Sequence, residues 1–75
     1  MYNQISTTTA IDLGMALRRL RHSLDLSQED VTRDTMIHTS EISRLERGHI
    51  RSIRGLLHIE NMLDYYKLLV WEDGR

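Results

Sequence analysis

The chain has 75 residues, no cysteine, and a formal net charge of −1 at pH 7. This length predicts one small domain whose core gives only marginal stability, and dimerisation would add buried surface. The lack of cysteine excludes disulfides and cysteine-bound zinc. The four histidines share no metal-ligand spacing, so we expect no metal and no cofactor: His22, His38, His49 and His58. No catalytic set of carboxylates, nucleophile and base, or phosphate loop can be assembled, so no enzyme is expected.

Membrane and export signals are also missing from the sequence. The longest apolar run near the C-terminus, Leu68–Trp71, is far shorter than the roughly 20 residues that span a bilayer. The N-terminus lacks a basic stretch followed by an apolar one. The sequence therefore predicts a cytoplasmic protein with no membrane partner.

Residues 1–8 are polar and β-branched without a clear period, which predicts a flexible N-terminal arm. A helix is then predicted from Thr9 to about Ser23, because Thr9 and Asp12 can cap its start. One face of this helix carries leucines at helical spacing: Leu13, Leu17, Leu20 and Leu24.

Two short helical patterns follow, separated by a gap too tight for a loop. The first is predicted from Ser27 to about Thr35, where Ser27 and Asp30 can cap the free amides of a helix start. The second runs from about Thr39 to Arg47, and Gly48 suits the position after a helix end. Their inward apolar positions are Val31, Ile42 and Leu45. This arrangement is typical of a helix-turn-helix.

A fourth helix is predicted from Ser52 to about Leu63, with Leu56, Ile59 and Leu63 as an inward stripe. After Asp64 the chain becomes rich in aromatic and branched residues, which favours a short strand. A lone strand would need a partner, so we expect it to pair with the same strand of a second subunit. Its dimerisation residues would be Tyr66, Leu68, Val70 and Trp71. A fifth helix that packs Leu63, Tyr66 and Val70 on the bundle is the alternative.

The run from Ser27 to Gly48 resembles the helix-turn-helix of the XRE family, the phage repressor and Cro family. It opens with Ser27-Gln28-Glu29 and closes with Glu46-Arg47-Gly48 at the family's separation. The resemblance covers roughly residues 11–63. It implies an all-α, lambda-repressor-like domain of four to five helices over residues 9–64. The composition after this domain adds the expected dimerisation strand and tail over residues 65–75. The resemblance also implies a sequence-specific DNA-binding regulator, expected as a dimeric repressor of a palindromic operator in double-stranded DNA.

The middle of this run departs from the family pattern. Met36 stands where the family usually has glycine, and a left-handed backbone there costs a residue with a Cβ about 1 kcal/mol. Thr35 replaces a usual core leucine, Thr32 a common alanine, and His38 a common serine or threonine cap. The pose of the second helix therefore rests on a substituted turn.

The opening turn of this second helix would lie deepest in the major groove, which makes Thr39 and Ser40 candidates for base contacts. Arg44 lies one turn beyond Ser40 and can bridge the two acceptors of a guanine. The alternatives for Arg44 are phosphate contacts alone, or a pair with Glu41 three residues earlier.

Phosphate contacts are expected around this helix. Gln28 lies at a helix N-terminus, which favours an anion, and in the resembling family the matching Gln clamps the DNA backbone. The net charge is negative, but four arginines and one acid lie between residues 44 and 54. The further phosphate candidates are Ser43, Arg47, Arg51 and Arg54. By resemblance, Arg21 forms a structural ion pair with Glu46.

Two other functions stay open. A helix followed by an apolar strand resembles the HipB-like branch of the family, whose members dimerise through that strand and act as antitoxins of HipA-like toxin kinases. The acidic balance and Glu41 fit instead a protein-interaction module that has lost DNA binding.

Overall fold

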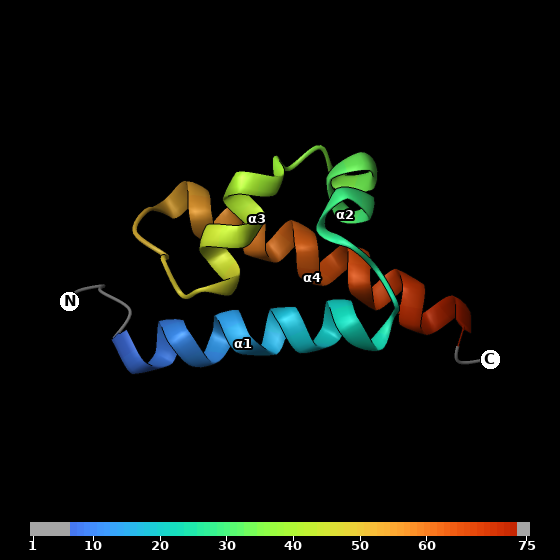
Figure 1. Cartoon of the computed structure of the whole chain (residues 1–75), viewed down its shortest axis with the longest axis horizontal. Coiled ribbons are helices and arrows are strands. Elements are labelled where there is room, and N and C mark those ends of the chain that lie inside the picture. Colours follow the sequence, from blue (N-terminus) through green and yellow to red (C-terminus); the bar gives the residue numbers. More distant parts are fainter. Residues whose placement is uncertain (1–6, 74–75) are drawn as a thin grey trace.

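The computed structural model describes residues 7–73, which form four helices (Figure 1). They are α1 (Thr7–Ser23), α2 (Gln28–Thr35), α3 (Thr39–Glu46) and α4 (Ile53–Asp73). The long helices α1 and α4 run along the molecule, and the short pair α2 and α3 lies above α1 in the view of Figure 1. The prediction of an all-α, four-helix domain is confirmed.

The first helix begins two residues earlier than predicted. Thr7 and Thr8 are helical, whereas the rest of the expected arm lies outside the described residues. Leu17 is fully buried, and the other three leucines of the predicted stripe pack against the core. At Gly14, α1 passes so close to the end of α3 that an added Cβ would lie 2.6 Å from the carbonyl oxygens of Leu45 and Glu46.

Local side-chain chemistry sets the ends of α2. The Ser27 Oγ accepts from the amide of Asp30 at 3.0 Å, and the Asp30 carboxylate accepts from the amide of Ser27 at 2.9 Å. This reciprocal pair satisfies two amides that a helix start leaves without partners. Met36 closes α2 with a left-handed backbone, at a φ of 66°.

The turn and the start of α3 keep the usual geometry with unusual residues. The amide of Met36 donates to the carbonyl of Thr32 at 2.8 Å, and the Met36 side chain is 85% exposed. His38 caps α3, because its Nδ1 accepts from the amide of Ser40 at 3.1 Å. The substitutions at these positions therefore change the chemistry of the turn while α2 and α3 still form.

Replacing Met36 with glycine should stabilise the fold by up to about 1 kcal/mol, because glycine adopts positive φ without a steric cost. Little packing is lost, since the side chain points into solvent. The free energy of unfolding, measured by urea denaturation, tests this. Met36→Ala is the control, because it removes the long side chain but keeps the Cβ. Equal stability of the two variants would contradict strain at Met36.

The predicted C-terminal strand is wrong, because α4 continues through Asp64 to Asp73 as one helix. Ile59, Met62 and Tyr66 recur at helical spacing and are all buried, with Tyr66 only 1% exposed. This stripe carries the helical period past residue 64, and the helix satisfies its backbone groups without a partner strand. The alternative of a separate fifth helix is also not observed, since the segment extends the fourth.

This correction changes the roles of the predicted dimerisation residues. Tyr66 belongs to the core of its own chain, whereas Leu68, Val70 and Trp71 are exposed on α4. The predicted inward stripe is also partly wrong, because Leu56 and Leu63 are exposed and only Ile59 is buried. The buried apolar residues of α2 and α3 are as predicted, and the core cluster comprises Leu17, Val31, Ile37, Ile42, Leu45, Ile59, Met62 and Tyr66. Across residues 7–73, no helix combines the length and apolar character that a bilayer crossing needs.

Candidate nucleic-acid interface

The outward side of α3 carries all three predicted base-contact residues. Ile42 and Leu45 are fully buried, so the opposite side of this helix faces outward. Ser40 and Arg44 are exposed one helical turn apart, and Thr39 is half-buried in the opening turn. The helix therefore presents a hydroxyl and a guanidinium on one accessible face.

Arg44 is held by an acid of its own helix. Its Nη2 donates to Glu41 Oε1 at 2.7 Å, and the other carboxylate oxygen lies 3.2 Å from Nδ1 of His58 on α4. The hydrogen bond from Arg44 lowers the pKa of Glu41, partial burial opposes this shift, and His58 lowers the pKa further. Glu41 is thus a carboxylate at neutral pH. Exposed pairs of this kind are worth only about 1 kcal/mol or less, so Arg44 can exchange Glu41 for another acceptor.

Further arginines follow α3. Arg47 Nη1 donates to Ser43 Oγ, which places these two predicted phosphate contacts side by side. Arg51 and Arg54 are exposed and form no ion pair with any residue between 7 and 73. Arg44, His49 and Arg51 also line one hollow beside the start of α4. The end of α3 and the loop after it therefore form a cationic surface.

The predicted pair of Arg21 and Glu46 joins α1 to the end of α3. Arg21 Nε lies 2.7 Å from Glu46 Oε2, and Arg21 Nη2 donates to Oε1 at 3.0 Å. The third nitrogen, Nη1, donates to the carbonyl of Leu26 at 2.9 Å. The two side chains are only 9% and 4% exposed, and the hydrogen bond to Glu46 raises the pKa of Arg21.

Gln28 lies at the first position of α2 and is connected to this pair. Its Nε2 donates to Glu46 Oε1 at 3.2 Å. The predicted phosphate clamp is thereby tied to α1 and α3 through a single carboxylate. The amide end of Gln28 is half-buried, so it lies at the edge of the core.

Sequence reasoning missed two links that α4 makes to the helix pair. The Tyr65 hydroxyl donates to the carboxylate of Asp34 on α2, and His58 contacts Glu41 on α3. Burial and this carboxylate raise the pKa of Tyr65 to about 12. The partners lie 31 and 17 residues apart, so no local spacing signals them.

Comparison with known families decides the classification of this geometry. The family model described as a helix-turn-helix domain matches residues 12–70, most of the chain. The chain belongs to the helix-turn-helix domain family. No curated protein and no solved structure gives a significant match. In helix-turn-helix terms, α2 is the first helix, Met36 lies in the turn, and α3 is the helix that this fold places in the major groove of DNA.

Proposed function

We propose that this helix-turn-helix protein is a sequence-specific DNA-binding regulator that represses transcription as a dimer on a palindromic operator. The observation that carries the proposal is the exposed face of α3, where Ser40 and Arg44 lie one turn apart beside a cationic surface. In a dimer, two copies of α3 would contact half-sites about one helical turn of DNA apart.

The proposed contacts divide into two groups. Thr39, Ser40 and Arg44 contact base edges, because the first turns of the recognition helix lie closest to the floor of the groove. The remaining residues contact phosphates and fix the position of the helix. They are Gln28 on α2, Ser43 on α3, and Arg47, Arg51 and Arg54 after α3.

Arg44→Ala tests the base contact. The operator is first selected from a pool of random duplexes, and binding is then measured by fluorescence anisotropy on single base-pair variants. We expect the variant to lose discrimination at one base pair, with a change of about 5- to 150-fold, equivalent to about 1–3 kcal/mol. Arg19→Ala is the matched control. This control removes the same charge from α1. Arg19 lies two residues from both Leu17 and Arg21, which are buried, so its side chain is on the opposite, outward side of that helix.

Equal weakening of Arg44→Ala on all duplexes would place Arg44 on a phosphate and not on a base. It would leave the assignment of the DNA-binding class intact but would refute the role given to Arg44.

A protein-interaction module without DNA binding is the second candidate, favoured by the pairing of Arg44 with Glu41 and by the net negative charge. A salt titration separates the two functions. Phosphate contacts make the logarithm of the binding constant fall linearly with the logarithm of salt concentration. No binding to any selected or random duplex at low salt would favour the interaction module.

A HipA-like kinase partner has no support in residues 7–73. The resemblance to the HipB-like branch rested on a strand after Asp64, and that segment belongs to α4.

A further inference from the structure

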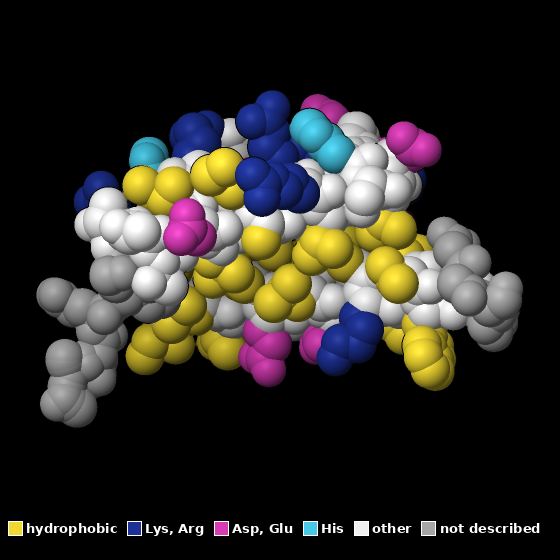
Figure 2. Space-filling view, turned by 90° about the horizontal axis from the view of Figure 1, so that it is seen from below, with side chains coloured by type: hydrophobic (Ala, Val, Ile, Leu, Met, Phe, Trp, Pro, Cys, Tyr) yellow, Lys and Arg dark blue, Asp and Glu magenta, His cyan; other side chains and the backbone are white. Residues whose placement is uncertain are grey.

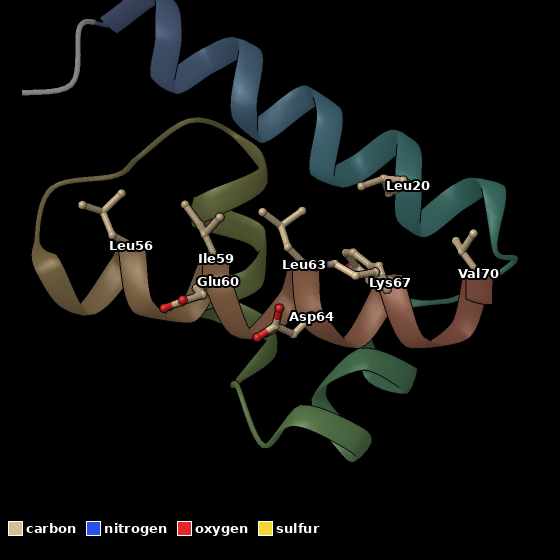
Figure 3. Close-up of a pocket in the computed structure, with 9 residues that line it drawn as sticks. Leu20, Leu56, Ile59, Glu60, Leu63, Asp64, Lys67 and Val70 are labelled. Atoms are coloured by element: carbon tan, nitrogen blue, oxygen red, sulfur yellow. The ribbon is translucent and has the colours of Figure 1, made fainter. Parts of the chain in front are cut away.

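An apolar groove runs between α1 and α4. Figure 2 shows hydrophobic side chains collected in a band along the molecule, with charged groups on both sides of the band. Leu56, Ile59, Leu63 and Val70 point from α4 toward α1, where Leu20 faces them (Figure 3). Among these, Leu56, Leu63 and Val70 are large apolar side chains left exposed. We call this feature the α1–α4 groove.

The rim and floor of the groove contain one regular series along α4. Counting from Leu56, the series continues at intervals of four, three, four and three residues, and every member lines the groove: Leu56, Glu60, Leu63, Lys67 and Val70. An average interval of 3.5 residues is the repeat by which one helix packs against another along its whole length. We call this series the α4 seam.

The α4 seam is complementary to itself in one orientation. If two α4 helices lie antiparallel with a two-fold axis at Leu63, Leu56 lies opposite Val70 of the partner subunit. Lys67 of the partner subunit then lies within one residue of the position opposite Glu60, an offset of about 1.5 Å along the helix that long side chains can bridge. The same two contacts occur again by symmetry. A parallel pairing in register would instead place Glu60 against Glu60 and Lys67 against Lys67, which is repulsive.

Glu60 and Lys67 are available to pair with a second subunit. Glu60 and Lys67 form no ion pair with any residue of the described part of the chain. Seven residues along a helix separate them by about 10 Å, so they cannot pair with each other. Two acids, Glu60 and Asp64, and one base, Lys67, line the groove. Because Glu60 and Lys67 lie on opposite sides of Leu63 at nearly equal distances along α4, the charge pattern fits a second copy of the chain.

α4 is long enough for an extended contact with this occupant. A stable interface takes about 800 Å² from each partner, roughly one seventh of the 5406 Å² that the chain exposes. The 21-residue α4 is about 31 Å long, and Leu20 of α1 widens the contact. A single domain of 75 residues also gains most from added burial, because its own core is small.

We propose that a second copy of this chain occupies the α1–α4 groove, with the two α4 helices antiparallel about a two-fold axis at Leu63. This assigns the dimer face that the proposed function requires. Only the role of this dimer in binding DNA rests on the proposed function, because association of the two chains is measured without DNA.

Charge exchange tests the proposal by sedimentation equilibrium. The unmodified chain should have twice its 8.9 kDa mass at micromolar concentration. Glu60→Lys alone and Lys67→Glu alone should each raise the dissociation constant at least tenfold, because like charges then meet twice. An equimolar mixture of the two variants should form a heterodimer, since both contacts become complementary again. Glu72→Lys is the control, because it makes the same charge change on α4 outside the seam.

A crosslink tests the orientation, because the chain contains no cysteine of its own. Leu63→Cys should form a disulfide-linked dimer with oxidised glutathione, since the two sulfurs meet at the axis. Ile53→Cys should not, because in the antiparallel pair its two copies lie about 30 Å apart. A parallel pair in register would bring together identical residues along the whole helix, so crosslinking at both Leu63 and Ile53 would show it.

Either a parallel pair or an unmodified chain that stays monomeric up to millimolar concentration would overturn the proposal. Arg44→Ala should remain dimeric, so a failure of DNA binding and a failure of association give different results.

Discussion

Replacing Glu46 with alanine should lower the free energy of unfolding by about 3–5 kcal/mol, because it leaves the Arg21 guanidinium buried without its counter-charge. Both side chains of the pair are less than one tenth exposed, and two N–H groups of Arg21 donate to the carboxylate. The same change removes the acceptor of Gln28. A 75-residue domain has about 4–11 kcal/mol of stability in total. The variant should therefore be largely unfolded at moderate urea concentrations.

Urea denaturation followed by circular dichroism measures this effect. Arg33→Ala is the control, because the Arg33 side chain is 68% exposed and its loss from the pair with Asp30 should change stability by less than about 1 kcal/mol. The double variant Arg21→Met with Glu46→Leu should recover most of the loss, since it leaves no buried charge alone. A loss below 1 kcal/mol for Glu46→Ala would show that Arg21 regains water or another partner.

Gly14→Ala should destabilise the fold by about 3 kcal/mol, although alanine has a higher intrinsic helix propensity than glycine. The new Cβ would lie 2.6 Å from the carbonyl oxygens of Leu45 and Glu46 and 2.8 Å from the amide nitrogen of Gly48. These are backbone atoms, so no side-chain rotation relieves the overlap. The end of α3 would have to move away from α1, which also strains the Arg21–Glu46 pair.

Gly55→Ala is the matched control for this substitution. Gly55 is also helical and buried, but its nearest contact for a new Cβ is Leu45 Cδ2 at 3.5 Å, an ordinary van der Waals distance. Alanine should therefore raise stability there by about 0.5–1 kcal/mol. Thermal denaturation of the two variants separates the cost of steric overlap at Gly14 from the gain in helix propensity, because both substitutions share that gain. A Gly14→Ala variant as stable as the unmodified chain would mean that α1 and α3 are not held at this distance.

The parts of the fold that sequence predicts depend on contacts between near neighbours. Ser27 and Asp30 cap α2 from three residues apart, and Val31, Ile42 and Leu45 are buried as their spacing indicates. Left-handed geometry at Met36 follows from its place in the turn. For Arg44 the sequence left two alternatives to a base contact, phosphate contacts alone or a pair with Glu41. In the structure, which contains no DNA, Arg44 pairs with Glu41.

The parts that sequence does not predict depend on distant contacts. The composition of residues 65–71 favours a strand, but burial of Tyr66 against the core continues the helix. The close approach of Gly14 to Leu45 and Glu46 depends on how α1 crosses α3. No local pattern encodes that crossing, and the same holds for the contact of His58 with Glu41.

The two sides of α4 carry separate tasks. Ile59, Met62 and Tyr66 hold the helix in its own domain, while Glu60 and Lys67 line the adjacent groove and are not part of that core. In the proposed dimer, a change of charge at Glu60 or Lys67 therefore alters which chain the helix associates with and leaves its folding intact. Duplicated copies of such a gene can diverge into mutually exclusive pairs by a few substitutions, without passing through an unstable protein.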